Sequence, residues 1–159
     1  MKKLKFAFCV CLSIIFTSCY TLKSPIINQI SSLDDYTYFY VTPTQDLTSS
    51  AGVTISGQYY SSSKTVNPSD LISGYLIKQG YVRIPTIEDD KKHKTFIVNY
   101  GESGRRNLFL AYSIEVTMQF ISASNHNIIC VTTAEGVGDT EADDIRIAIN
   151  RALDALFKK

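Results

Sequence analysis

Residues 108–120 show the clearest pattern of apolar and polar positions in the chain. Apolar side chains occupy every second position, and polar side chains occupy most of the positions between them. The apolar set is Leu108, Leu110, Tyr112, Ile114, Val116, Met118 and Phe120, and the polar set is Ser113, Glu115, Thr117 and Gln119. This period of two predicts a long strand with one packed face and one face in water. A single wet face favours an antiparallel sheet that helices cover on one side only.

Shorter segments that are rich in aromatic and β-branched residues predict the other strands. These segments are residues 36–42, 52–60, 81–84, 95–100 and 126–135. Loops are expected in the serine-rich stretches on either side of 52–60 and in the charged residues 87–94, and turns are expected over 101–107 and 123–127. The long strand and residues 126–135 should therefore form a hairpin.

Two stretches have the apolar period and the end signals of amphipathic helices. The first covers residues 68–79. Asn67 can cap its free N–H groups, Pro68 suits the first helical position, and Gly80 suits a left-handed stop. These end signals predict a helix that lies between two strands of the sheet.

The second helix covers residues 141–158 and begins with a capping-box pattern from Thr140 to Asp143. Its apolar stripe, which can lie on the sheet, is Ile145, Ile149, Ala152, Leu153 and Leu156. Together with the strands, the two helices predict one α+β domain over residues 36–159. We expect two layers: a mostly antiparallel sheet of about five strands, with both helices packed on one face.

Residues 1–18 form a basic and then apolar leader that ends in small residues beside Cys19. As a helix, its apolar part, residues 6–16, would cover roughly half of a ~30 Å hydrocarbon core, which is too little for a stable transmembrane span. That length suits a secretory leader, and the alternative is a buried N-terminal helix. The leader resembles that of bacterial lipoproteins, and the resemblance to their lipobox rests on Phe16-Thr17-Ser18-Cys19. In that family the leader is removed and the cysteine becomes a lipidated N-terminus, so the resemblance implies lipidation of Cys19.

The residues that follow Cys19 bear on the location of the protein. In lipoproteins of this kind, an Asp directly after the cysteine resembles an inner-membrane retention signal, and an acidic run resembles a surface-export signal in Bacteroidetes. Residues 20–24 contain neither, so the resemblance implies an outer-membrane lipoprotein that faces the periplasm. Residues 19–35 are expected to hold the lipidated cysteine and a tether, although three of them can dock on the domain: Ile26, Ile27 and Ile30.

Charge and cysteine content narrow the class of protein. The whole chain has a formal net charge of +1, and loss of the leader with its three lysines leaves about −2. Neither sign dominates, so no nucleic-acid partner is expected. Cys9 and Cys11 leave with the leader, and a lipid on Cys19 would leave Cys130 without a disulfide partner in the chain. Cys130 lies in an apolar run and is expected to be a small buried side chain.

Catalytic and metal-binding patterns are sparse. His93 and His126 lie in a charged loop and a turn, and neither has a second His, Cys or acid at ligand spacing. No nucleophile-elbow pattern precedes a helix. Gly136-Val137-Gly138 lies between a strand and a helix, but Glu141 stands where a dinucleotide fingerprint needs its third glycine. We therefore interpret these glycines as a strand exit, and we predict no cofactor, no metal and no enzymatic activity.

Two groups of residues are candidates for binding. Arg105 and Arg106, in the expected turn, either bind a lipid phosphate or a peptidoglycan carboxylate or are simply solvated. The second group is a set of tyrosines on one strand face and on the expected neighbouring strand: Tyr36, Tyr38, Tyr40, Tyr59 and Tyr60. These rings either pack in the core or, if that face is uncovered, form an aromatic recognition surface.

The order of elements resembles that of small envelope lipoproteins with an α/β module related to the TolB N-terminal and CsgG domains. The matching segments are residues 76–81, 95–98 and 147–153. Members of this type that are understood are assembly or interaction modules. The resemblance therefore implies a non-enzymatic module that is anchored in the membrane and binds another envelope protein. The alternatives are a binder of a small envelope glycan or lipid, and an unrecognised hydrolase.

Overall fold

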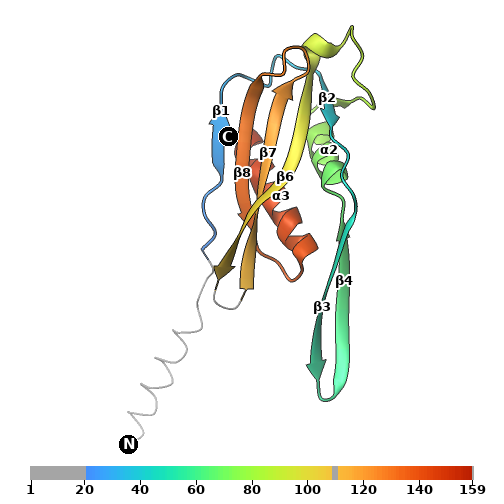
Figure 1. Cartoon of the computed structure of the whole chain (residues 1–159), viewed down its shortest axis with the longest axis vertical. Helices are drawn as coiled ribbons and strands as arrows, with labels where there is room; N and C mark the ends of the chain where they lie inside the picture. The colour runs from blue at the N-terminus through green and yellow to red at the C-terminus, as the bar shows by residue number, and fades with distance from the viewer. Residues whose placement is uncertain (1–20, 109–110, 159) are drawn as a thin grey trace, which may run out of the picture.

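A computed structural model of the chain describes residues 21–108 and 111–158. The predicted leader, residues 1–18, lies outside the described residues, as do Cys19, Leu110 and Lys159. The described chain forms a main sheet with helices against it and a separate hairpin that projects from one end (Figure 1). Neither helix of this described part has the length and apolarity needed to cross a lipid bilayer.

The main sheet has six strands in the order β1-β8-β7-β6-β2-β5. Their bounds are β1 Ile26–Gln29, β2 Tyr38–Val41, β5 Val82–Arg83, β6 Thr95–Leu108, β7 Ala111–Ser122 and β8 Ile128–Gly136. Strands β1, β8, β7 and β6 pair antiparallel in that order, whereas β2 pairs parallel with both β6 and β5. The sheet is mixed because the chain passes through a hairpin and a helix between β2 and β5.

The predicted α+β class is confirmed, but the sheet is larger than predicted. One added strand, β1, comes from residues 19–35, which we expected to be a tether. Ile26–Gln29 pairs antiparallel with β8, from Thr133 back to Cys130. The tether prediction is wrong for this strand because its backbone groups satisfy the open edge of β8.

A second sheet of two strands, β3 (Leu47–Ile55) and β4 (Gln58–Val66), forms a long hairpin that we call the ribbon. The chain reverses at Ser56 and Gly57, whose φ values of 50° and 79° both lie in the left-handed region, as a type I′ turn requires. The prediction of one strand over residues 52–60 is wrong because this turn falls in its middle. The serine-rich stretches that we predicted as loops belong to the two strands.

Strand β6 continues through residues 101–107, which we predicted to be a turn. It pairs with β7 from Phe96 to Leu108, with a register shift between Glu102 and Gly104. A shift of this kind lets one strand absorb an irregularity without ending the pairing. The turn prediction is wrong because β7 is long enough to pair with the whole of this segment.

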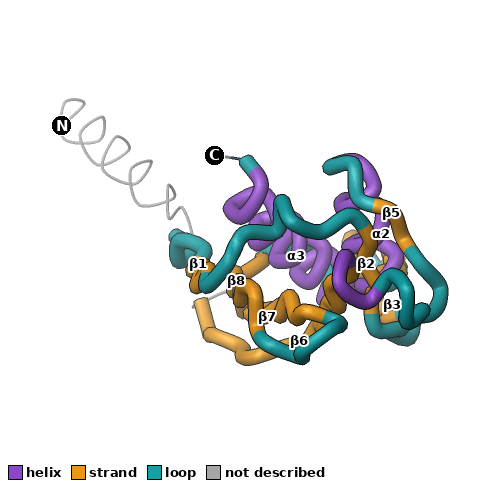
Figure 2. Tube along the Cα trace, turned by 90° about the horizontal axis from the view of Figure 1, so that it is seen from above, coloured by secondary structure: helices purple, strands orange, loops and turns teal. Residues whose placement is uncertain are grey.

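Both helices lie on the same side of the main sheet (Figure 2). Helix α2 (Pro68–Lys78) begins as predicted, with the Asn67 side chain accepting a hydrogen bond from the Asp70 N–H at 3.2 Å. Gly80 leaves this helix with a φ of 95°. Helix α3 (Glu141–Phe157) is capped by Thr140 and buries the whole predicted apolar stripe. The two helix predictions are therefore confirmed.

Helix α3 packs closely on β8. A Cβ at Gly136 would overlap the backbone of Asp144, so only glycine fits where the helix crosses the strand. Four residues earlier in β8, Thr132 donates from its hydroxyl to the Ala152 carbonyl at 3.2 Å. The Gly138 N–H donates to the Asp144 carboxylate in the turn between the two elements. The glycines thus serve the strand exit and the helix packing.

The two faces of β7 differ as its alternation predicts from Ile114 to Phe120, but Tyr112, which was expected on the packed face, is exposed. The residues buried on the helix side are Ile114, Val116, Met118 and Phe120. The residues that water reaches on the other side are Glu115, Thr117 and Gln119. Ser113 was expected to be wet, but it is buried. The reason is an ion pair between Arg106 and Glu135 that crosses β7 at this position.

Candidate functional site

Glu135 lies on the outer face of the sheet, yet its side chain is only 3% exposed. Arg106 covers it from β6, donating from Nε to Oε1 at 2.9 Å and from Nη2 to Oε2 at 2.6 Å. Bidentate pairs of this kind are among the strongest that proteins form. Arg106 pairs in register with Ser113 of β7, and Glu135 pairs with Glu115 of the same strand. The ion pair therefore spans β7 from one neighbour to the other.

The same carboxylate holds the N-terminal segment. The Lys23 N–H donates to Glu135 Oε2 at 3.1 Å, and Lys23 Nζ lies 3.5 Å from Oε1. Arg106 Nη2 also donates to the Thr21 carbonyl at 3.4 Å. Arg151 of α3 donates to the Glu135 carbonyl and, at 2.9 Å, to the Lys23 carbonyl. We call Lys23, Arg106, Glu135 and Arg151 the docking cluster.

The electrostatics of the cluster favour the ionised pair. Hydrogen bonds from Arg106 lower the pKa of Glu135 to about 2, against the opposing effect of burial, and the Lys23 N–H adds to the lowering. The Glu135 carboxylate in turn raises the pKa of the Arg106 guanidinium. Glu135 is therefore charged at any physiological pH. Because Arg106 is partly exposed and Glu135 is not, loss of Arg106 would leave a buried charge without its main partner, which is the costly way to break such a pair.

The cluster fixes the chain close to Cys19. Thr21 and Lys23 are bound directly, and strand β1 follows at Ile26. The two residues from Cys19 to Thr21 reach at most about 7 Å when extended. A group attached at Cys19 would therefore be held near the sheet, whereas a free tether over residues 19–35 would let it move far away.

Arg105 has different partners from Arg106. It binds Glu141 at the start of α3, lies 3.7 Å from Glu102, and stacks 5.5 Å from the ring centre of Tyr112. Glu141 is the main cause that raises the pKa of Arg105. Both arginines lie in a strand, so the turn assumed for their anion-binding role is wrong. An external phosphate or carboxylate would have to compete with carboxylates of the chain itself.

The tyrosines predicted to share one strand face lie on two. Tyr36 packs edge-on against Phe96 in the core, with ring centres 5.9 Å apart. Tyr38 and Tyr40 are half-buried on the opposite side, because the fully buried Phe39 lies between them. The prediction is wrong for Tyr36 because β2 begins only at Tyr38, and the alternation of a strand does not extend beyond it.

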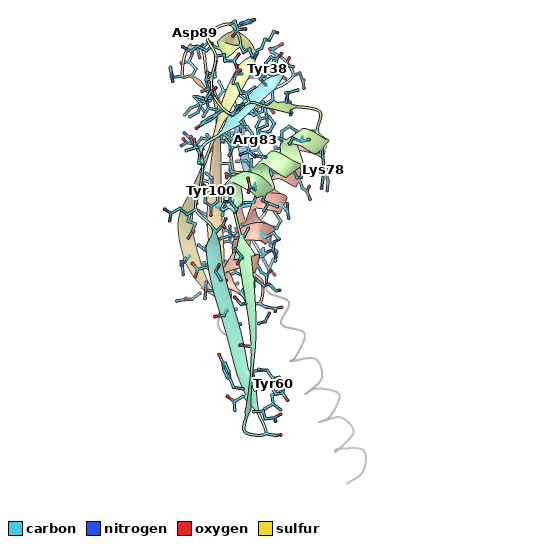
Figure 3. The ribbon with its side chains drawn as sticks, turned by 90° about the vertical axis from the view of Figure 1, so that its right-hand side faces the viewer. Tyr38, Tyr60, Lys78, Arg83, Asp89 and Tyr100 are labelled. Atoms are coloured by element: carbon cyan, nitrogen blue, oxygen red, sulfur yellow. The ribbon has the colours of Figure 1, made fainter. Side chains whose placement is uncertain are left out.

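Tyr59 and Tyr60 do not adjoin β2 either. They belong to the ribbon, where they are 71% and 55% exposed, and the neighbours of β2 in its sheet are β5 and β6. Figure 3 shows Tyr38 and Tyr60 at opposite ends of the molecule. The five tyrosines therefore do not form one aromatic surface.

Other reactive side chains lie apart from the cluster. His93 and His126 are exposed, in a 3-10 turn and in the β7–β8 hairpin turn. Cys130 is buried as predicted, and burial raises its pKa to about 11. Within residues 21–108 and 111–158, no three His, Cys, Asp or Glu side chains gather as a metal site.

Sequence reasoning identified Arg106 as a candidate but missed its partners. Glu135 was assigned to the end of a strand, and an acid at the end of an apolar strand is the signal that a buried partner is needed. Lys23 was assigned to the tether, and Arg151 lies outside the apolar stripe predicted for α3. These residues come together only through the pairing of β1, β8, β7 and β6.

Comparisons with known proteins add distant structural neighbours. No protein-family model matches the sequence, and no curated protein matches it. Among solved structures, a single-substitution variant of the PelC dodecamer from Paraburkholderia phytofirmans aligns at 14% identity with a TM-score of 0.49, covering 84% of this chain and 98% of that chain. A second PelC dodecamer structure from the same organism aligns at 14% identity with a TM-score of 0.45, covering 83% and 96%. Similarity at this level does not bear on the function of the present chain.

Proposed function

We propose that this chain is an outer-membrane lipoprotein that faces the periplasm and is anchored through acyl chains on Cys19. Its α+β domain acts as a non-enzymatic interaction or assembly module for another envelope protein. The observation that carries the proposal is the docking cluster, which binds Thr21 and Lys23 to the sheet directly after the lipobox-like residues.

Because residues 21–23 are bound to the sheet, an anchor at Cys19 would fix the orientation of the domain relative to the membrane. Each buried acyl CH₂ contributes about 0.8 kcal/mol, and two or more chains hold a protein firmly on a bilayer. Because Cys19 is within about 7 Å of Thr21, an anchored domain stands directly at the membrane surface. A long tether would let the domain rotate, whereas a docked one always presents the same surface to a partner.

Strongly shifted pKa values outside the docking cluster trace to packing. Burial is the largest cause of the raised pKa values of Tyr75, Tyr100 and Cys130. Tyr75 also donates to Asp154 at 2.8 Å, which ties α2 to α3. A perturbed catalytic group usually lies in a cleft with convergent polar groups. Tyr75 and Cys130 belong to helix and sheet packing instead, which supports an interaction module, whereas Tyr100 lines a surface hollow with Glu102 and Gln119.

An open sheet edge supports a protein partner. Strand β1 is the last strand on its side of the main sheet, and all four of its residues are exposed. Ile26, Ile27 and Ile30 add apolar surface along this edge. Extended peptides bind such edges by adding a strand, with backbone hydrogen bonds for affinity and side-chain pockets for specificity.

The replacement Cys19→Ser tests the anchor. The wild-type protein should incorporate labelled palmitate and sediment with outer membranes, and Cys19→Ser should do neither. Cys130→Ala is the matched control, because it removes a buried cysteine and should keep the lipid. A Cys19→Ser protein that still sediments with membranes at the normal mature mass would contradict the anchor.

Crosslinking in intact cells, followed by mass spectrometry, tests the module. We expect one envelope protein to be recovered reproducibly with the wild-type chain. Its recovery should fall when Ile27→Lys places a charge on the β1 edge. If no envelope protein is recovered, the interaction module is wrong even where the anchor is present.

A further inference from the structure

The ribbon has an unusual surface for a projecting hairpin. From Leu47 to Ser63 its sequence contains no charged residue, and Asp46 and Lys64 bound this stretch. Leu47 packs against the core, but the large apolar and aromatic side chains nearer the turn are each more than half exposed: Val53, Ile55, Tyr59 and Tyr60. The outer half of the ribbon therefore presents apolar and aromatic groups among hydroxyls. Its own residues carry no charge, and Asp139, from the turn before α3, lies beside Val53 and Tyr60.

Such a ribbon gains little stability by itself. A two-stranded hairpin is marginal in water, and proteins usually protect open strand edges with charges, bulges or covering elements. In the described chain neither edge of the ribbon pairs with a third strand. Tyr59 covers Gly52 across the ribbon, since a Cβ at Gly52 would overlap its ring. This contact involves one ring, and Val53, Ile55 and Tyr60 remain more than half exposed.

The ribbon points to the end of the molecule where the described chain begins. In Figure 1 the ribbon extends toward the same end of the molecule as the last residues of β6 and the first residues of β7, which is also the end at which the described N-terminal segment meets the sheet. Figure 3 shows the same arrangement from the side, with Tyr60 at this end and Tyr38 at the other. A lipid on Cys19, about 7 Å or less from Thr21, would also lie at this end.

We propose that the tip of the ribbon, residues 53–60, contacts the interfacial region of the bilayer that holds the acyl chains of Cys19. This inference rests on the anchor proposed above. Tyrosine rings and aliphatic side chains favour the membrane–water interface, and the absence of charge removes the main cost of entering it. The unpaired backbone groups of the ribbon edges stay hydrated among lipid headgroups, so the contact is peripheral.

The anchor makes a weak second contact sufficient. Once Cys19 is attached, binding of the ribbon is intramolecular and benefits from a high effective concentration at the surface. Two contact points on the same bilayer then set the tilt of the domain. The docking cluster and the ribbon would thus share one task, which is to hold the domain in a fixed orientation.

The absence of tryptophan from the sequence offers a clean probe. Tyr60→Trp places the chain's single tryptophan on the ribbon, and Tyr38→Trp places it at the far end as the control. Both proteins are studied as the full mature chain in phosphatidylethanolamine–phosphatidylglycerol vesicles, with and without brominated acyl chains. The emission of Tyr60→Trp should shift to shorter wavelength and be quenched by the brominated lipid. Tyr38→Trp should show no quenching, and Ile55→Asp combined with Tyr60→Trp should lose most of it.

The outcomes separate the ribbon contact from the anchor. If intact mass shows the lipid on Cys19 but Tyr60→Trp is not quenched, the ribbon contact is wrong and the anchor stands. If the mass shows an unmodified chain, the anchor is wrong. The ribbon contact is then supported if brominated vesicles quench Tyr60→Trp, and it is wrong if they do not. A shift of Tyr60→Trp that depends on protein concentration and occurs without vesicles would mean that a second copy covers the ribbon, which overturns the membrane contact.

Discussion

Arg106 and Glu135 lie on strands that are not neighbours, and their bidentate ion pair closes over β7 between them. The same carboxylate accepts a hydrogen bond from the Lys23 N–H. One buried acid therefore ties three strands together on the outer face and binds the N-terminal segment to them. Stability of the sheet and docking of the segment should respond together to changes at Glu135.

Arg106→Ala should lower the free energy of unfolding by more than Arg105→Ala does, because it leaves the buried Glu135 without its main partner. Arg105→Ala is the matched control on the same strand. Its pair with Glu141 is half-exposed on the arginine side, so the loss should be about 1 kcal/mol or less. Urea unfolding followed by circular dichroism measures both. Equal losses in the free energy of unfolding for the two variants would show that the Arg106–Glu135 pair stabilises the fold no more than the Arg105–Glu141 pair does.

The acid dependence of stability should report the same pair. The pKa of Glu135 falls from the ordinary 4.5 to about 2 in the folded state. Since the folded pKa lies below the unfolded one, the stabilisation is fully present above about pH 5 and is lost as the pH falls toward 2. Wild type and Glu135→Gln should therefore differ most near neutral pH and converge in acid. Parallel curves over this range would contradict the assigned pKa.

Amide hydrogen exchange distinguishes a docked segment from a tether. The N–H groups of β1 that point toward β8 should exchange slowly, as should the Ile30 N–H, which donates to the Ile129 carbonyl at 2.8 Å. Residues 21–25 should be protected more weakly through the Lys23 N–H, and Arg106→Ala should remove that protection while sparing β1. If residues 21–30 exchange at the rate of an unstructured peptide, docking is contradicted and the tether prediction is supported.

Two glycines test the packing of α3. Gly136→Ala should destabilise the fold by at least about 2 kcal/mol, because its Cβ would overlap the helix backbone at Asp144. Gly74→Ala, in α2, meets no atom within 4 Å and should stabilise the protein by about 0.5–1 kcal/mol through helix propensity. Thermal unfolding of the two variants gives the comparison. A tolerated Gly136→Ala would mean that α3 lies farther from β8.

The parts of the fold that the sequence predicted are those with local physical signals. The alternation of β7 places Val116 and Phe120 in the core, and the caps at Asn67 and Thr140 begin the two helices. The ribbon was missed because Ser56 and Gly57 lie between β-branched and aromatic residues that predict one continuous strand, and because the serine-rich stretches on either side also fit loops. Glycine is common in type I′ turns, but it is also common in other turns, so Ser56-Gly57 does not by itself identify a hairpin.

The docking cluster could not be predicted because it depends on long-range register. Arg106 is 29 positions from Glu135, and its contact with Thr21 spans 85 positions. Neither the turn expected near Arg106 nor the tether expected near Lys23 is excluded by local composition. Only the pairing of β6, β7, β8 and β1 brings these charges together, and a wet strand position, Ser113, becomes buried as a consequence.

The most direct test of the proposed anchoring is the mass of the N-terminal peptide of the protein isolated from the cell envelope. We predict that the mature chain begins at Cys19 and that this peptide has the added mass of two or more acyl chains. The Cys19→Ser chain should lack this peptide. An unmodified peptide that begins at Met1, or one cleaved elsewhere without lipid, would contradict both the anchor and the orientation that docking gives to the domain.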